Sequence, residues 1–334
     1  MKEFEYINAK TIDEAISLLS EVEDAVAIAG GTDLLTVMKS EILSPKRLVN
    51  IKTIPNLDQI RQIDDQGLSI GALASLSQIS KDEMVKDSCG ILIQAINRIA
   101  TPQIRNVGTI GGNLCQKPRC WYYRNPSFQC FRKGEKICFA VRGENRYNAI
   151  IDGSPCFMVH PSDLATVLMA LDAKIGIVGS DGEKSIPIDD FFVSPKVSLK
   201  ETNVLKPSEL ITEIKIPKLN DGSKTIFLKE SERKTWDFAI VSVAVKLDID
   251  GDRINSARIV LGGVSPTPFR AREAEKLLEG NSVNKDLIDI VSNEAVSKSR
   301  SLKGNEYKVS LAKSLVKQAL LEINTEAQRH GEDI

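Results

Sequence analysis

The amino-acid sequence predicts an α+β chain built from two domains. Its 334 residues are too many for one ordinary hydrophobic core and suit two or three modest domains. Helical and strand-like patterns alternate up to a polar, turn-rich segment at residues 218–223, and strand-like runs followed by helical ones come after it. We therefore predict a first domain at 1–219, with subdomains at about 1–55 and 56–219, a second domain at 224–324 and a flexible tail at 325–334.

The first domain is expected to open with a helix, a short strand and a glycine turn. Thr11 stands at a helix N-cap position before the periodic apolar run 12–19, with Glu14 three residues on. Residues 25–29 form a short apolar run that ends at two glycines, which indicates a buried strand. Beyond this opening we predict strands at 47–51, 68–72 and 174–178, helices at 91–99 and 161–171, and a tight turn at 179–182.

The second domain is expected to begin with strands and to end with helices. Residues 225–229, 239–248 and 253–261 are strand-like, whereas residues 271–278 and 309–323 have helical spacing. Strands followed by helices are typical of an α+β domain.

The composition argues against nucleic-acid binding and against a membrane protein. Lysine plus arginine (44) nearly balances aspartate plus glutamate (45), so the formal net charge of -1 creates no field that would attract a polyanion. No apolar run reaches the span of a bilayer, and the N-terminus lacks a secretory pattern. We therefore expect a cytoplasmic protein, in which clustered cysteines serve as metal ligands or redox groups rather than as disulfides.

A pair of glycines, Gly30 and Gly31, follows the first predicted strand. Without Cβ atoms, these residues allow backbone amides to turn towards an anion and allow a pyrophosphate to come close. Thr32 and Asp33 come next and could cap the following turn. The segment matches neither a P-loop nor Gly-x-Gly-x-x-Gly, and taken alone an ordinary turn is the simpler interpretation.

A second glycine-rich segment covers residues 106–114. Three glycines within five positions disfavour both a strand and a helix, so we expect this backbone to pack against something flat or phosphorylated. Thr109 and Asn113 would supply hydrogen-bonding groups. Two such turns in one domain favour a dinucleotide, because a dinucleotide has two phosphates, a ribose and a flat ring to bind.

The segment His160-Pro161-Ser162-Asp163 has the pattern of a helix start. Ser162 and Asp163 suit the first helical turn, and capping is the plain interpretation. His160 could act as a base, but a solitary histidine beside a proline is more often structural.

Five of the six cysteines lie between residues 115 and 156, and the sixth, Cys89, stands apart. The five lack the paired Cys-x-x-Cys knuckles of a zinc ribbon, so the loose spacing favours an iron–sulfur cluster over zinc. Aromatic residues in the same loop could shield a cluster, although ordinary loop packing explains them equally well. Five cysteines for four ligand positions leave the assignment open, and Cys115, directly after the glycine segment, could face a cofactor instead.

In this order, residues 29–35, 106–114 and 161–164 closely resemble the FAD-binding subunit of the molybdenum hydroxylases, the family of xanthine dehydrogenase, aldehyde oxidoreductases and carbon monoxide dehydrogenase. Residues 228–231 and 260–264 resemble its C-terminal domain. The resemblance implies a two-subdomain FAD-binding domain of the PCMH/VAO type, followed by a smaller α+β domain of the CO dehydrogenase flavoprotein type. Residues 119–124 look most like the branch with an additional [4Fe–4S] loop, which includes the β subunit of 4-hydroxybenzoyl-CoA reductase and the flavin subunits of certain bacterial aldehyde oxidoreductases.

The resemblance also implies roles for individual residues. The FAD pyrophosphate would be wrapped by the first glycine turn, which consists of Ala27, Ile28, Ala29, Gly30, Gly31, Thr32 and Asp33. The second side of the cofactor would be held by Thr109, Gly112 and Asn113, and its ribitol or adenosine part by Asp163. Ile211 would pack on the isoalloxazine, although an ordinary strand core residue explains it alone. Lys229 would lie near the pyrimidine edge of the flavin, although a solvated strand lysine explains it alone. The cluster ligands would be Cys120, Cys130, Cys138 and Cys156, which leaves Cys115 spare.

The resemblance finally implies an electron-transfer subunit of an oxidoreductase, with no catalytic residues of its own for the substrate. A small subunit with [2Fe–2S] clusters and a large molybdenum-cofactor subunit would complete a heterotrimer or its dimer, and NAD or ferredoxin would be the external carrier. Two alternatives remain open at this point: a stand-alone flavoprotein oxidoreductase of the same fold, and a non-enzymatic zinc-binding scaffold. The molybdenum subunit would select the substrate, and aldehydes, purines and aromatic acyl-CoA compounds all agree with the resemblance.

Overall fold

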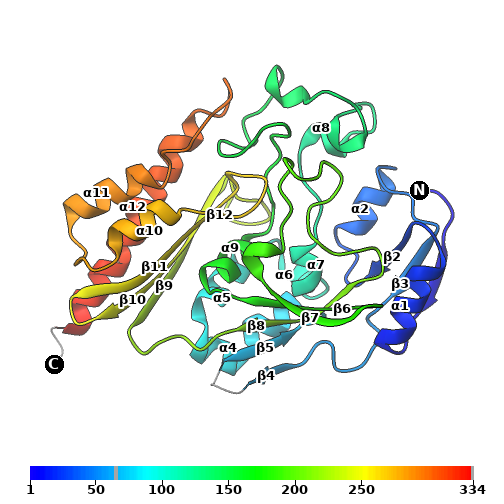
Figure 1. Ribbon diagram of the computed structural model, residues 1–334, viewed down its shortest axis with the longest axis horizontal. Coiled ribbons are helices and arrows are strands. Elements are labelled where there is room, and N and C mark those ends of the chain that lie inside the picture. The colour runs from blue at the N-terminus through cyan, green and yellow to red at the C-terminus, as the bar shows by residue number, and fades with distance from the viewer. Residues whose placement is uncertain (64–66, 332–334) are drawn as a thin grey trace. The chain divides into compact units, whose positions relative to one another are not determined.

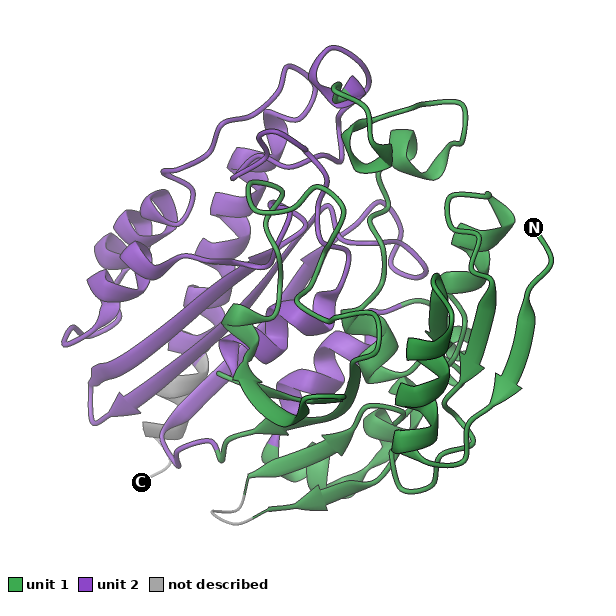
Figure 2. Ribbon diagram, turned by 45° about the vertical axis from the view of Figure 1, so that its right-hand side comes forward, with its two compact units in different colours: residues 1–88, 100–138, 172–218 green, residues 89–99, 139–171, 219–334 purple. Residues whose placement is uncertain are grey.

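The computed structural model describes the backbone of residues 1–63 and 67–331 and the side chains up to residue 325. The chain forms two compact units, shown in two colours in Figure 2. Unit 1 consists of residues 1–88, 100–138 and 172–218, and unit 2 of residues 89–99, 139–171 and 219–334. The chain therefore passes between the units several times, and each unit is built from segments that are distant in the sequence.

Unit 1 contains two sheets, which Figure 1 labels by strand. The first is parallel, in the order β1-β3-β2, and consists of β1 (Glu5–Asn8), β2 (Ala25–Ile28) and β3 (Arg47–Asn50). The second is antiparallel, in the order β4-β5-β8-β6-β7, and consists of β4 (Ile60–Gln62), β5 (Leu68–Gly71), β6 (Lys174–Gly179), β7 (Gly182–Pro187) and β8 (Leu210–Ile216).

The helices of unit 1 are mostly short. They are α1 (Ile12–Glu21), α2 (Leu34–Lys39), α3 (Leu76–Lys81), α4 (Glu83–Ser88), α6 (Pro102–Arg105), α7 (Ile110–Leu114) and α8 (Trp121–Arg124). Helix α1 packs its Ala15, Ile16 and Leu19 into a core shared with the parallel sheet. Its N-cap is the predicted one, because the Thr11 hydroxyl accepts a 3.1 Å hydrogen bond from the Glu14 N–H.

Unit 2 is an antiparallel four-stranded sheet covered by helices on both faces (Figure 1). The strand order is β12-β11-β10-β9, made of β9 (Ser223–Glu230), β10 (Val241–Asp250), β11 (Arg253–Gly262) and β12 (Phe269–Arg270). One face packs an aliphatic core against α10 (Arg272–Leu278), α11 (Lys285–Glu294) and α12 (Tyr307–Gly331). The other face is covered by α5 (Gly90–Asn97) and α9 (Asp163–Ala170), which come from far earlier in the chain.

Alternation along β10 explains why both faces are covered. Val241, Val243 and Val245 point into the aliphatic core, whereas Ser242 points to the face that carries α9. Here Ser242 and Thr166 of α9 both approach Gly262, where a Cβ atom would lie 2.3 and 2.5 Å from their hydroxyl oxygens. This close packing of α9 on the sheet therefore requires glycine at position 262.

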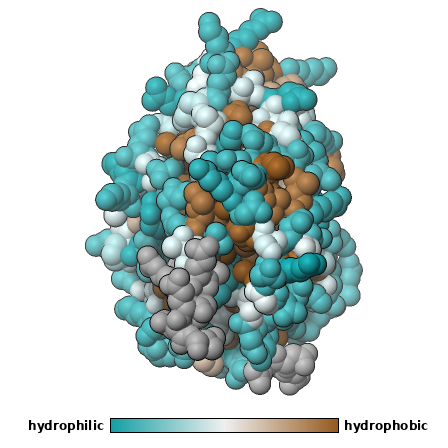
Figure 3. Space-filling model, turned by 90° about the vertical axis from the view of Figure 1, so that its left-hand side faces the viewer, coloured by the Kyte–Doolittle hydropathy of each residue, from teal (hydrophilic) through white to brown (hydrophobic). Residues whose placement is uncertain are grey.

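The surface of the described residues is mixed in polarity. Figure 3 shows hydrophobic residues gathered among hydrophilic ones on the side where Figure 1 draws α10 to α12. Exposed apolar side chains on these helices include Leu277, Ile290 and Leu321. In the part of the chain that the structure describes, no helix combines the length and the apolarity needed to span a bilayer.

The predicted elements are confirmed where periodicity or caps were clear, and three differences stand out. Residues 110–114, for which the glycines disfavoured a helix, form α7, because Thr109 caps its first turn. Strand β1 and helix α11 were not predicted, although Asn284 caps α11 and its Ile288 and Val291 are buried. Helix α12 continues to Gly331, past the tail boundary expected at residue 325, and residues 332–334 of that tail lie outside the described residues.

Candidate functional site

The first glycine turn of unit 1 connects β2 to α2. Glycine is required at its two positions for different physical reasons. Gly31 has φ +67°, in the left-handed region that glycine adopts without strain. Gly30 packs against the second glycine segment, because a Cβ atom there would lie 2.2 Å from the Val107 carbonyl oxygen. The two glycine segments predicted from the sequence therefore lie in direct contact.

The backbone N–H groups of this turn are available to a ligand. Within the described residues, the N–H groups of residues 29–33 donate no hydrogen bond to any other group. A run of free N–H groups on a glycine turn is typical of a site for an anion such as a phosphate. This observation fits the pyrophosphate of a dinucleotide at the predicted position.

The second glycine segment is stabilised by hydrogen bonds within itself and to the residue after β5. The Thr109 hydroxyl accepts a 3.1 Å hydrogen bond from the Gly112 N–H, and Gly111 donates at 2.9 Å to the Ala72 carbonyl oxygen just after β5. Gly111 also packs closely on Ala72, since a Cβ atom at position 111 would lie 3.0 Å from the Ala72 Cβ. Thr109 therefore uses its hydroxyl oxygen to cap α7, with its side chain buried.

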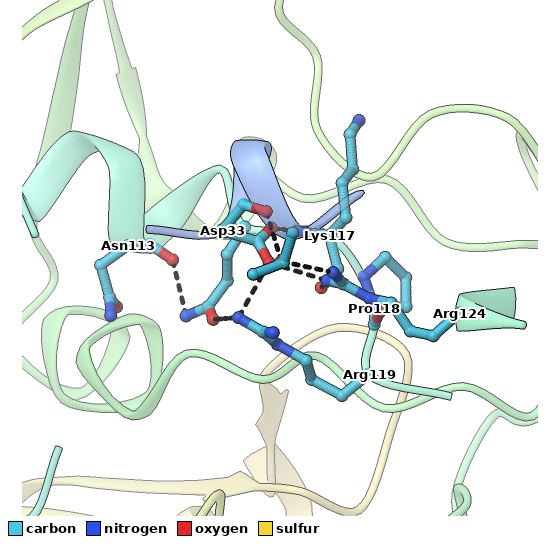
Figure 4. A network of polar contacts seen from close by, with 8 residues as sticks. Asp33, Asn113, Lys117, Pro118, Arg119 and Arg124 are labelled. Atoms are coloured by element: carbon cyan, nitrogen blue, oxygen red, sulfur yellow. Dashed lines mark hydrogen bonds and ion pairs between the residues drawn. The ribbon is translucent and has the colours of Figure 1, made fainter. Parts of the chain in front are cut away.

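The Asp33 side chain does not cap α2, contrary to the expectation. Its carboxylate instead accepts hydrogen bonds from the segment after α7, as Figure 4 shows. The donors are the Lys117 N–H at 2.7 Å and an Arg124 guanidinium nitrogen at 2.8 Å. An Arg119 guanidinium nitrogen forms an ion pair with the same carboxylate at 2.8 Å. The two guanidinium groups bring full positive charge to the carboxylate, whereas the N–H groups at a helix N-terminus offer only partial charge, which explains why the carboxylate turns this way.

Sequence reasoning missed these cationic partners. Gln116 continues the same network, because its side-chain N–H group donates at 3.0 Å to the Asn113 carbonyl oxygen in α7. The sequence patterns single out Arg119 and Arg124 only as part of a family-like run around Cys120. The signal that could have found them is the excess of basic residues between positions 117 and 133, directly beside two turns expected to hold an anion.

The two predicted polar residues of unit 2, Asp163 and Lys229, form an ion pair with each other. Lys229 on β9 lies 2.7 Å from the Asp163 carboxylate at the start of α9, and both side chains are almost fully buried. The Lys229 ammonium also donates at 2.8 Å to the Arg98 carbonyl oxygen. The interpretation of Lys229 as a solvated strand lysine is therefore wrong, whereas contacts of Lys229 and Asp163 with a cofactor stay a prediction.

Helix capping at the start of α9 is confirmed. The Ser162 hydroxyl accepts a 3.0 Å hydrogen bond from the Ala165 N–H, and the buried His160 accepts one at 3.3 Å from the Ser162 N–H through Nδ1. These contacts give His160 a structural role. Ile211, in unit 1, is a buried residue of β8 that lies opposite Ile177 of β6.

The cysteines are distributed over both units. Cys115, Cys120, Cys130 and Cys138 belong to unit 1, and Cys156 belongs to unit 2. Burial raises the pKa of the Cys115 thiol to about 11, which disfavours the thiolate. Among the described residues, no three His, Cys, Asp or Glu side chains form a group that could hold a metal ion. The four ligands implied by the resemblance stay a prediction.

Two family models together match almost the whole chain. The FAD binding domain in molybdopterin dehydrogenase matches residues 2–219, and the CO dehydrogenase flavoprotein C-terminal domain matches residues 226–323. The expected α+β fold, with an FAD-binding domain followed by this C-terminal domain, is thus confirmed.

Individual relatives agree with the family models. The aldehyde oxidoreductase FAD-binding subunit PaoB of Escherichia coli (strain K12) is 33% identical over 331 residues, which cover 98% of this chain and 100% of that protein. The carbon monoxide dehydrogenase medium chain of Hydrogenophaga pseudoflava is 28% identical over 323 residues, with 95% and 96% covered. A solved structure of carbon monoxide dehydrogenase from the same organism superimposes with a TM-score of 0.77 at 27% identity, covering 96% of each chain.

The fold, the turn with free N–H groups and the similarity to these relatives together define the class of protein. It is an FAD-binding oxidoreductase subunit. The chain belongs to the FAD-binding medium subunits of the molybdenum hydroxylase family.

Proposed function

We propose that this chain holds one FAD and passes electrons between molybdenum and iron–sulfur partner subunits and an external carrier. The observation that supports FAD most directly is the run of N–H groups at residues 29–33 that donate no hydrogen bond within the described residues, on a turn that contacts the second glycine segment. Residues 27–33 would surround the pyrophosphate, and Thr109, Gly112 and Asn113 the second side of the cofactor. Asp163, Ile211 and Lys229 complete the proposed set.

The bound FAD would supply electron exchange in one-electron or two-electron steps. The chain's own contribution is binding and electrostatics. Free N–H groups in the first turn would neutralise phosphate charge, and aliphatic Ile211 would exclude water from a flat ring. The buried ammonium of Lys229 would favour negative charge on any nearby group, to the extent that Asp163 does not already compensate it.

FAD titration of the flavin-free chain tests this proposal. FAD fluorescence should be quenched with one site per chain, and FAD should bind far more tightly than riboflavin, because only FAD brings a pyrophosphate to the first turn. Equal affinity for FAD and riboflavin would mean that the turn holds no phosphate. A protein that binds zinc and no flavin would favour the alternative of a zinc-binding scaffold.

We further propose that Cys120, Cys130, Cys138 and Cys156 bind a [4Fe–4S] cluster. The support is the number and softness of the thiol ligands and the resemblance of residues 119–124 to the branch with a cluster loop. Because no three His, Cys, Asp or Glu side chains of the described residues form a metal-binding group, the support for the cluster comes from the sequence.

Replacing one proposed ligand and the spare cysteine separately tests the cluster assignment. C138S should remove the iron and its spectroscopic signature while FAD stays bound. The matched control C115S should keep both. Stoichiometric iron in C138S would show that the ligand assignment is wrong.

The partners we propose are a small [2Fe–2S] subunit and a large molybdenum-cofactor subunit in a heterotrimer or its dimer, with NAD or ferredoxin as the carrier. The support is that the related proteins from Hydrogenophaga pseudoflava and Afipia carboxidovorans are described as medium chains of carbon monoxide dehydrogenase. Affinity purification of the tagged native chain should recover both partners. Substrate turnover by the isolated chain would instead favour the stand-alone flavoprotein.

A further inference from the structure

The Asp33 carboxylate stands in an unexpected place for a phosphate site. It belongs to the same turn whose N–H groups at residues 29–33 are free for an anion. Negative charge beside a bound pyrophosphate lowers affinity through like-charge repulsion. A turn that binds phosphate therefore needs a reason to tolerate this aspartate.

Two guanidinium groups explain why the turn can contain this aspartate. Arg119 and Arg124 each place a guanidinium nitrogen 2.8 Å from the same Asp33 oxygen. The Asp33 side chain is only 15% exposed, and the Arg124 side chain 16%. At this burial, water screens the charges poorly, so the carboxylate depends on its cationic partners for compensation.

Arg124 also fixes the position of its own guanidinium. Its nitrogens donate to the Pro118 carbonyl oxygen at 2.7 Å, to the Lys117 carbonyl oxygen at 2.8 Å and to the Thr36 hydroxyl at 3.3 Å. Figure 4 shows this fork reaching Asp33, Lys117 and Pro118. The planar five-donor fork of arginine makes such a set possible, and lysine could not reproduce it.

We propose that Arg124 is a positioning residue for FAD: its guanidinium neutralises the Asp33 carboxylate beside the phosphate-binding turn. This inference rests on the proposed FAD function and changes one detail of it. The backbone of Asp33 forms part of the turn, while its carboxylate contacts other residues of the protein and does not contact the cofactor. FAD affinity therefore depends on Arg124, although Arg124 does not touch FAD.

A double-mutant cycle with two flavins tests the proposal. R124Q leaves the Asp33 charge under-compensated and should weaken FAD binding about tenfold, equivalent to roughly 1.4 kcal/mol. Riboflavin binding should change by less than about threefold, because riboflavin lacks phosphate. D33N/R124Q removes both charges and should restore FAD affinity to within about threefold of wild type, which loss of structure alone would not allow.

D33N alone separates the two possible roles of Asp33. If its carboxylate serves the protein, FAD affinity should stay equal or increase. If the carboxylate contacts the cofactor, D33N should weaken FAD binding, and the proposal is overturned. R61Q is the control, because Arg61 is an exposed residue of the same unit, 62% exposed, paired with Glu213. FAD affinity of R61Q should match wild type.

The remaining outcomes are also decisive. Unchanged FAD affinity in R124Q overturns the positioning role and leaves the FAD function intact, whereas a wild-type chain that binds no FAD overturns both. Thermal unfolding of each variant shows whether it folds. If R124Q does not fold, D33N/R124Q decides the question: FAD affinity within about threefold of wild type supports charge compensation, and a tenfold loss opposes it.

Discussion

Lys229 and Asp163 form an ion pair in the interior of unit 2, with 2.7 Å between the ammonium nitrogen and the carboxylate oxygen. The pair connects β9 to the start of α9, and reciprocal contacts with Arg98 add α5: the Lys229 ammonium donates to the Arg98 carbonyl oxygen, and the Arg98 guanidinium donates to the Lys229 carbonyl oxygen, each at 2.8 Å. This network joins segments from residues 89–99 and 139–171 to the C-terminal sheet.

Neutralising one partner of this pair should destabilise the chain. D163N leaves a buried ammonium without a counter-charge, which typically costs about 3–5 kcal/mol in the free energy of unfolding. Urea denaturation measures the loss, and D163N/K229M should recover part of it. The control D181N removes the partner of Lys206 in a pair that is 61% and 74% exposed, and its midpoint should not shift. A D163N midpoint equal to wild type would contradict the buried pair.

Gly30 should be intolerant of a side chain. In G30A the new Cβ would lie 2.2 Å from the Val107 carbonyl oxygen, so the two glycine segments must move apart. We expect a loss of about 1–3 kcal/mol in the free energy of unfolding and weaker FAD binding. G90A is the matched control, because a Cβ at Gly90 meets no atom within 4 Å. Tight FAD binding by G30A would show that this contact does not shape the site.

Lys308 should make stability depend on pH. Its buried ammonium donates to the carbonyl oxygens of Tyr147, Asn148 and Gly263, and burial lowers the pKa of Lys308 to about 7. The unfolded chain, with a lysine pKa near 10.4, binds more protons between these values, so folding is favoured as the pH rises through this window and disfavoured as it falls.

The measurement is the difference in unfolding free energy between wild type and K308M as a function of pH. Since the methionine side chain of the variant does not titrate, wild type should gain about 2 kcal/mol relative to K308M between pH 7 and pH 9. Loss of the three hydrogen bonds offsets the whole curve without changing its slope. Parallel pH curves for the two proteins would mean that Lys308 keeps an ordinary pKa in the folded state.

The fold could be predicted from the sequence because the informative patterns are local. The Thr11 cap, the alternation in β10 and the glycines at positions 30 and 31 act within a few residues of themselves. The sequence also led to the prediction that both glycine segments hold one cofactor. The contact of Gly30 with Val107 shows that the segments adjoin, and their shared role stays a prediction. Helix α7 was not predicted from the sequence, because the N-cap at Thr109 outweighs the poor helix propensity of two glycines.

The side-chain partners could not be predicted, because they depend on contacts distant in the sequence. Asp33 finds Arg124 across 91 residues, and Lys229 finds Asp163 across 66. Local rules suggest a helix cap for Asp33 and a solvated strand position for Lys229. In both places burial makes charge pairing the stronger requirement, and only the folded chain shows which partner is within reach.

FAD content of the native complex tests the central claim most directly. The complex is isolated through a tag on this chain and denatured, and the released flavin is identified and quantified against the polypeptide. The account predicts one FAD per chain. Flavin-free complex with its partner subunits present, or FMN in place of FAD, would contradict it.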